Sequence, residues 1–172
     1  MNASAAADQG PVLLALYDRA LPQVYGYLAT RVNDPTVAED LTGETFLAAV
    51  RAVREHKVPD LTVAWLITVA RNKLVDHWRR VARDERGLRL ASDSDDEVDD
   101  GIDARFDRIR THEVLAELGA HHRAALTLRY LDGLSVPEVA GHLDRTVHAT
   151  EALLVRARRA FRARYDEGRG DD

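Results

Sequence analysis

Arginine side chains gather near the end of the chain, in a stretch that reads SVPEVAGHLDRTVHATEALLVRARRAF. Residues 145–164 hold six arginines and one acidic residue, a balance that suits contact with nucleic-acid phosphates. The stretch predicts two short helices around a tight turn at Asp144-Arg145, the second of which can enter the major groove of DNA. Amphipathic helix pairs are common, so the pattern alone leaves DNA binding and simple packing as alternatives.

A second set of polar side chains shares one face of the helix expected near residues 62–85. Their spacing of i, i+4, i+7 and i+11 places them on one side: Asn72, Asp76, Arg79 and Arg83. Apolar residues take the opposite side: Leu66, Ala70, Leu74, Trp78 and Val81. Amide, carboxylate and guanidinium groups can contact bases and phosphates, and a solvated face is the alternative.

The histidine pairings in this sequence do not predict a metal or catalytic site. Asp76 and His77 are adjacent on one helix and point about 100° apart, so they cannot hold one ion together. The His121-His122 pair has no cysteine or clustered carboxylate beside it. We therefore expect no enzyme activity, no metal or other cofactor and no small-molecule substrate.

The elements that position these residues are all expected to be helices. Strand-type alternation of apolar and polar residues never extends beyond four residues, which predicts an all-α fold. We expect helices at about 11–20, 22–32, 35–56, 62–85, 105–118, 121–132, 135–143 and 146–165, with Pro22 restarting the second. The clearest helix starts are Asp34, the Ser135/Glu138 capping box and Thr146.

An acidic tract separates the two groups of helices. Residues 92–103 read SDSDDEVDDGID, with seven acidic residues and no basic one, and cannot bury enough apolar surface to fold. We expect two small helical domains, at 11–87 and 105–165, joined by an acidic flexible linker at 88–104. A disordered tail at 1–10 and a second tail at 166–172 complete the expected organisation.

Composition is that of an ordinary globular protein. Hydrophobic residues make up 45% of the 172, and the net charge is −5. The absence of cysteine excludes disulfides, thiolate zinc sites and thiol redox switches within the chain. No stretch approaches the roughly 20 apolar residues that a membrane span needs, so we expect a cytoplasmic protein without membrane insertion.

Three blocks resemble a known family: AEDLTGETFLAAVRAV, AWLITVARNKLVDHWRR and LRYLDGLSVPEVAGHLDRTVHATEALLVRARRAF. Their order and spacing are similar to those of the extracytoplasmic-function (ECF) group of the sigma-70 family, bacterial RNA polymerase sigma factors, over about 14–90 and 106–165. The resemblance implies a region 2-like bundle and a region 4-like helix-turn-helix. It also implies a protein that binds core RNA polymerase, recognises promoter DNA and assists strand opening. The alternative is a stand-alone helix-turn-helix transcriptional regulator, which would not need the first two blocks.

The resemblance further implies which residues act. Binding of core polymerase falls on Glu39, Asp40 and Glu44. Promoter melting and contact with the minus-ten element fall on His56, Lys57, Asp60, Asn72, Asp76, Arg79, Arg80 and Arg83. Contact with the minus-thirty-five element falls on Thr146, His148, Ala149, Glu151, Ala152, Arg156, Arg158 and Arg159. Many relatives are held by an anti-sigma factor, which makes such a protein a candidate partner.

Two positions depart from the family pattern. Thr42-Gly43 stands where relatives commonly have an apolar residue and glutamine, and glycine inside a helix costs about 1 kcal/mol relative to alanine. Glu151 replaces a commoner basic residue: either it accepts from a cytosine amino group or it weakens binding by repelling phosphate. We assign Trp65, Trp78 and one of Phe46 and Leu47 to the core rather than to DNA or polymerase contact.

The acidic tract has three candidate roles. In relatives of this family the linker lies within the nucleic-acid channel of polymerase, where a polyanion occupies space later taken by RNA. A soluble spacer is the second role. The third is that the tract folds back on the arginines of residues 156–164 and inhibits the free protein.

Overall fold

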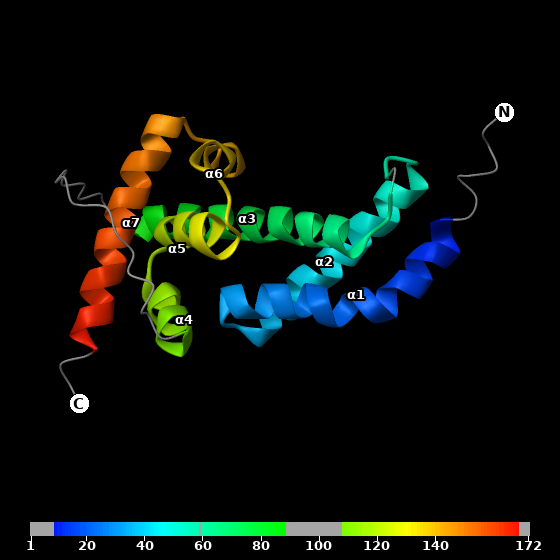
Figure 1. The fold of residues 1–172 in the computed structure, drawn as a ribbon, viewed down its shortest axis with the longest axis horizontal. Helices are drawn as coiled ribbons and strands as arrows, with labels where there is room; N and C mark the ends of the chain where they lie inside the picture. Colours follow the sequence, from blue (N-terminus) through cyan, green and yellow to red (C-terminus); the bar gives the residue numbers. More distant parts are fainter. Residues whose placement is uncertain (1–8, 59, 89–107, 169–172) are drawn as a thin grey trace. The chain divides into compact units, whose positions relative to one another are not determined.

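The computed structural model describes residues 9–58, 60–88 and 108–168. These residues form seven α-helices and one π-helical turn, with no strand among them, which confirms the all-α prediction (Figure 1). Residues 1–8, 89–107 and 169–172, which include most of the predicted linker and tails, lie outside the described part. Contacts between Cα atoms divide the chain into two compact units, Met1–Leu74 and Val75–Asp172, with the division inside a helix.

In the first unit, α1 (Gln9–Val32) packs against α2 (Pro35–Arg54) (Figure 1). The carboxylate of Asp34 accepts a hydrogen bond from the Thr36 N–H at 2.9 Å, and Pro35 follows at the first helical position, where its missing N–H costs nothing. This confirms the predicted helix start. Buried apolar residues recur at helical spacing in α1 (Leu16, Ala20, Val24, Leu28, Val32) and in α2 (Ala38, Leu41, Phe46, Ala49, Val53).

The predicted break at Pro22 is wrong, because α1 continues through it. Proline removes the hydrogen bond to the carbonyl of Asp18, four residues earlier. Asp18 and Pro22 are both exposed, so water can satisfy that carbonyl. Val24 and Leu28 are fully buried on the other side, and their packing holds the helix across the proline.

The next helix, α3 (Val63–Leu88), spans the division between the units. The Thr62 hydroxyl accepts from the Trp65 N–H at 3.1 Å, which caps the helix where the sequence predicts its start. Four residues of the predicted apolar face are buried: Leu66, Ala70, Leu74 and Trp78. Val81 is only half-buried, and Val75 and Ala82 are buried in addition. The buried stripe is therefore wider than the one predicted.

The second unit also contains α4 (Arg108–Glu117), α5 (Ala120–Leu126), η1 (Thr127–Leu131), α6 (Val136–Leu143) and α7 (Val147–Glu167). α7 packs against α4, α5 and α6 (Figure 1). Its buried residues are Thr150, Leu153, Leu154, Ala157, Phe161 and Tyr165. The predicted packing side of α7 is thus confirmed, although Ala160 is only half-buried.

Local hydrogen bonds build the helix-turn-helix as predicted. The Ser135 N–H donates to the Glu138 carboxylate at 2.7 Å, and the Glu138 N–H donates back to the Ser135 hydroxyl. Asp144 ends α6 in the left-handed region, with a φ of 52°. The Thr146 hydroxyl then accepts from the Ala149 N–H at 3.1 Å and caps α7.

The π-helical turn η1 was not predicted, because the sequence suggests one α-helix over 121–132. In η1 the Asp132 N–H donates to the Thr127 carbonyl, five residues earlier, at 3.0 Å. A π turn closes its hydrogen bond over five residues instead of the four of an α-helix. The side chains on this turn therefore point in different directions from those of a continuous α-helix. The chain leaves this turn at Gly133, whose φ of 68° favours glycine.

The end of α3 meets the start of α5 inside the second unit. The Glu85 carboxylate accepts from the Ala120 N–H at 3.1 Å, and an Arg86 guanidinium nitrogen lies 2.6 Å from His121 Nε2. Burial lowers the pKa of His121, and the charges of Arg145 and Arg86 lower it further. His121 is therefore kept neutral around neutral pH.

Candidate functional site

The three carboxylates assigned to polymerase binding lie on one helix, α2. Glu39 and Asp40 are exposed, and Glu44 is half-buried. Thr42 is buried, and its hydroxyl donates to the Ala38 carbonyl at 2.7 Å, so this departure from the family pattern leaves no unpaired hydroxyl. The carboxylates are thus available to a basic partner while the neighbouring threonine belongs to the core.

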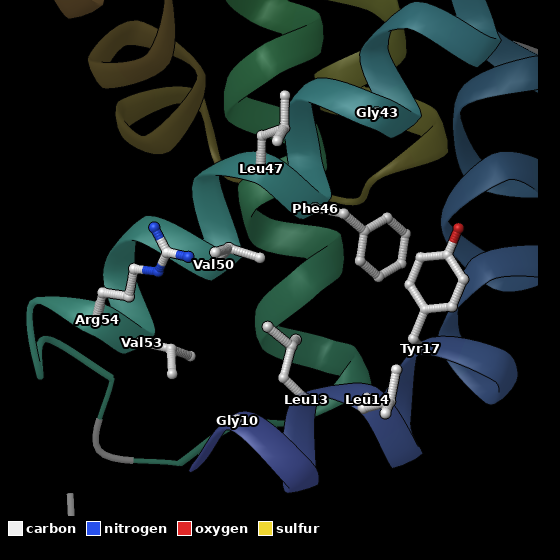
Figure 2. Close-up of a pocket in the computed structure, with 10 residues that line it drawn as sticks. All are labelled: Gly10, Leu13, Leu14, Tyr17, Gly43, Phe46, Leu47, Val50, Val53 and Arg54. Carbon is white, nitrogen blue, oxygen red and sulfur yellow. The ribbon is translucent and has the colours of Figure 1, made fainter. Parts of the chain in front are cut away.

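Beside these carboxylates lies an apolar groove between α1 and α2, which sequence reasoning missed (Figure 2). It has a volume of about 590 Å³ and is lined by Gly10, Leu13, Leu14, Tyr17, Gly43, Phe46, Leu47, Val50, Val53 and Arg54. A second hollow of about 550 Å³ shares Tyr17, Gly43 and Phe46 with it and reaches Tyr25 and Glu39. The two hollows together follow the helix pair over most of its length.

Two leucines make the groove unusually apolar for a surface. Leu14 is 73% exposed and Leu47 is 58% exposed. Phe46, in contrast, is buried, and its ring packs edge-on against the ring of Tyr17, with 4.7 Å between the ring centroids. Phe46 is therefore the core residue of the pair that the sequence left open, and Leu47 faces outward. An exposed cluster of large apolar side chains is typical of a protein-binding surface.

Because Gly43 has no side chain, it exposes the backbone of α2 in this groove. It is exposed, and apart from its chain neighbours and the backbone of its own helix, no atom lies within 4 Å of the place that a Cβ would occupy. Both hollows include Gly43 in their lining. A partner side chain can therefore approach the α2 backbone closely at this position.

The residues assigned to promoter melting are largely exposed. Asn72, Asp76, Arg80 and Arg83 on α3 are exposed, as are His56, Lys57 and Asp60 in the preceding loop. Trp78 is buried, which confirms its place in the core, while Trp65 is half-buried. The polar and apolar faces of α3 are thus separated as the spacing predicts.

Two cations among these residues already have partners in the free chain. Arg79 is half-buried, and its guanidinium donates to the main-chain carbonyl of His142 within the second unit. Lys57 lies 2.6 Å from the Glu55 carboxylate, and this hydrogen bond is the main reason that the pKa of Glu55 is below its ordinary value. A phosphate contact at either cation would use its remaining N–H donors or replace the present partner.

The residues assigned to the minus-thirty-five element lie along α7 and its cap. Thr146, His148, Glu151 and Arg159 are exposed, and Ala149, Ala152, Arg156 and Arg158 are half-buried. Leu153 is buried, which confirms that it belongs to the packing side. The exposed carboxylate of Glu151 therefore remains a real departure on the outer face of this helix.

Sequence reasoning also missed the partner of Arg158. Its Nη1 donates to the Tyr130 hydroxyl of η1 at 3.0 Å, across 28 residues of chain. The Arg129 guanidinium lies 5.7 Å from the centre of the Tyr130 ring and also donates to the Leu134 carbonyl at 3.0 Å. The sequence contains no local signal for these contacts.

Within residues 9–58, 60–88 and 108–168, no three histidine or carboxylate side chains are grouped so that they could hold a metal ion. In the same residues, no helix has both the length and the apolar content required to cross a bilayer.

Comparison with known proteins identifies both helical regions. The family Sigma-70 region 2 matches residues 16–84, and the family Sigma-70, region 4 matches residues 108–161. The ECF RNA polymerase sigma factor SigL of Mycobacterium tuberculosis is 32% identical over 170 residues, which cover 95% of this chain and 94% of SigL. BldN of Streptomyces coelicolor, also an ECF RNA polymerase sigma factor, is 31% identical over 91% of this chain, but the chain spans only 61% of its length.

A solved structure shares the fold. The sigma factor RpoE of Bartonella quintana, crystallised with the anti-sigma factor NepR, superposes with a TM-score of 0.52 at 21% identity, covering 88% of this chain and 95% of that one. The two family matches occur in the order that the sequence blocks predict, and they cover both helical regions. The chain belongs to the sigma-70 family, in its extracytoplasmic-function group.

Proposed function

We propose that this chain binds core RNA polymerase, recognises promoter DNA at the minus-ten and minus-thirty-five elements, and assists strand opening. The observation that carries the proposal is that region 2 and region 4 occur together on one chain. A stand-alone transcriptional regulator would use α7 but would not need α2 or the polar face of α3. The cytoplasmic polymerase performs the catalysis in this proposal, and the chain itself is no enzyme.

Polymerase binding is assigned to α2 and the groove beside it. Glu39, Asp40 and Glu44 suit a basic partner surface, where their contribution is to steer the encounter and fix its register. Leu14 and Leu47 add apolar area that would be buried on binding, which supplies most of the affinity of such contacts. Charge and apolar area lie side by side here, as they do in many protein interfaces.

Strand opening is assigned to α3 and the loop before it. Removing a base from the stack costs a few kcal/mol, so a surface that holds the flipped base makes opening easier. Asn72 and Asp76 carry amide and carboxylate groups that can bind base edges. Arg80 and Arg83 are exposed on the same helix and can hold the backbone.

Upstream recognition is assigned to the first turns of α7. His148 and Glu151 are exposed there, and a carboxylate can accept from a cytosine amino group. Arg156, Arg158 and Arg159 follow one to two turns later and suit phosphates. Few base contacts suffice because tethering to polymerase raises the local concentration of α7 at the promoter.

An anti-sigma factor is the further partner that we propose, since the RpoE relative is crystallised with one. Such a protein would compete with polymerase or DNA for the surfaces described above. Co-purification of the chain with polymerase in one preparation and with an anti-sigma protein in another would support this competition.

Capture of core polymerase tests the proposed function directly. The purified chain should capture core polymerase and direct run-off transcription on a library of genomic fragments. A charge-reversed variant, Glu39→Lys with Glu44→Lys, should lose capture, whereas Asp166→Lys at the exposed end of α7 should retain it. If the wild-type chain binds duplex DNA but never polymerase, the stand-alone regulator is the correct function.

A further inference from the structure

The contact between Arg158 and Tyr130 is the starting point for a further inference. The first turns of α7 are assigned to base contacts, and Arg158 is one of the arginines that follow them. Its Nη1 lies 3.0 Å from the Tyr130 hydroxyl. Tyr130 is 42% exposed, although it is a large aromatic residue in a packed domain. The hydroxyl of Tyr130 accepts this hydrogen bond and still has its own proton to donate.

The π-helical turn explains why Tyr130 can reach Arg158. The Asp132 N–H donates to the Thr127 carbonyl, five residues earlier, so this turn holds one residue more than an α-helical turn. Tyr130 lies within the turn. Arg129 braces the same turn by donating to the Leu134 carbonyl at 3.0 Å. The turn therefore holds Tyr130 in place from the α5 side while Arg158 meets it from α7.

We propose that Tyr130 is a positioning residue for DNA binding. Its hydroxyl fixes the direction of the Arg158 guanidinium, and the two groups together bind one phosphodiester of the promoter backbone. The Nη2 N–H of Arg158 and the Tyr130 O–H donate to the phosphate oxygens, while Nη1 keeps its hydrogen bond to the Tyr130 hydroxyl. This inference rests on the proposed function, and it adds a neutral phosphate ligand that none of the sigma-factor motifs in the sequence indicates.

The hydrogen bond to Tyr130 lowers the entropy cost that the Arg158 side chain pays when it binds a phosphate. A long flexible side chain loses rotamer freedom when it binds, and a hydrogen bond already made in the free protein removes part of that cost. Arg158 Nε is buried, so the terminal nitrogens do this work: Nη1 donates to Tyr130, and Nη2 can donate to a phosphate. Lysine at this position would keep the charge but not this geometry.

The alternative is that Tyr130 only stabilises the packing of η1 on α7. In that case loss of the hydroxyl would lower the melting temperature, and DNA binding measured well below that temperature would stay at the wild-type level. A phosphate contact through Arg158 makes a different prediction, because the effect of the hydroxyl then depends on the arginine.

A double-mutant cycle on the full chain distinguishes the packing role of Tyr130 from its role in phosphate binding. Binding to a mixed-sequence duplex is measured by fluorescence anisotropy between about 50 and 200 mM salt for wild type, Tyr130→Phe, Arg158→Ala and the double variant. Tyr130→Phe should weaken binding by about threefold to tenfold and leave the salt slope unchanged, because a neutral donor releases no counterion. Arg158→Ala should weaken binding and reduce the slope by about one.

On the Arg158→Ala background, Tyr130→Phe should have no further effect on binding. Tyr27→Phe on α1, outside both hollows, is the matched control and should bind as wild type does. If Arg158→Ala does not fold, Arg158→Lys serves as the second background, where the effect of Tyr130→Phe should also shrink. Equal losses on both backgrounds, or no loss at all, overturn the inference, whereas a wild-type chain that binds neither duplex nor polymerase overturns the proposed function instead.

Discussion

Replacing Gly43 with alanine should stabilise the protein. Gly43 is an interior residue of α2, and a glycine there costs about 0.8 to 1.0 kcal/mol relative to alanine. Outside its chain neighbours and the backbone of its own helix, the added Cβ would meet no atom within 4 Å, so no steric penalty offsets the gain. The full difference in helix propensity should therefore appear as an increase in the free energy of unfolding.

The expected gain is large enough to measure. For a unit of this size, about 1 kcal/mol raises the melting temperature by about 4 to 8 °C. Thermal and urea unfolding followed by far-UV circular dichroism would measure it in the full chain. Gly141→Ala is the matched control, since Gly141 is exposed within α6 and a Cβ there would also meet nothing within 4 Å.

The two glycine variants should differ in which unit they stabilise. Gly43→Ala should delay exchange of amide hydrogens in α1 and α2, and Gly141→Ala should delay exchange in α6 and α7. If Gly43→Ala lowers the melting temperature while Gly141→Ala raises it, then position 43 does not lie in an open helix interior. The description of the groove between α1 and α2 would then be wrong.

Three further changes test other parts of the structure. Leu47→Ala should leave the melting temperature almost unchanged, because the side chain is 58% exposed, yet it should weaken capture of core polymerase in a pull-down. Thr146→Ala should lower the free energy of unfolding by about 1 kcal/mol in urea, because it removes the N-cap of α7. The pKa of His121 is lowered in the folded chain, so its contribution to stability is present above about pH 6.5 and is lost as the pH falls. As the pH is lowered below about 6.5, the melting temperature should therefore fall more steeply for wild type than for His121→Gln. Parallel curves would contradict a lowered pKa of His121.

Much of the fold could be predicted because its signals are local. Asp34, the Ser135/Glu138 pair and Thr146 each satisfy a backbone N–H two or three residues away, so donor and acceptor are visible together in the sequence. The face of α3 that carries Asp76 could be predicted for a similar reason, since helical periodicity follows from spacing alone.

The misses share a different cause. Pro22 has a breaking signal that is also local, but burial of Val24 and Leu28 outweighs it. The π turn at Thr127–Leu131 changes the helical period without any characteristic residue type. At Pro22 the decisive energy comes from packing, which a short stretch of sequence does not contain.

The sequence by itself determined most of the helices, the caps at Asp34, Ser135 and Thr146, and the family, because these depend on residue types at fixed short spacings. Only the tertiary structure decided that Leu14 of α1 and Leu47 of α2 line one groove, and that Tyr130 meets Arg158. Each of these pairs brings together residues about 30 positions apart in the chain, and their placement depends on how whole helices pack. Periodicity determines which side of a helix is apolar, but packing determines which of its residues remain exposed for a partner.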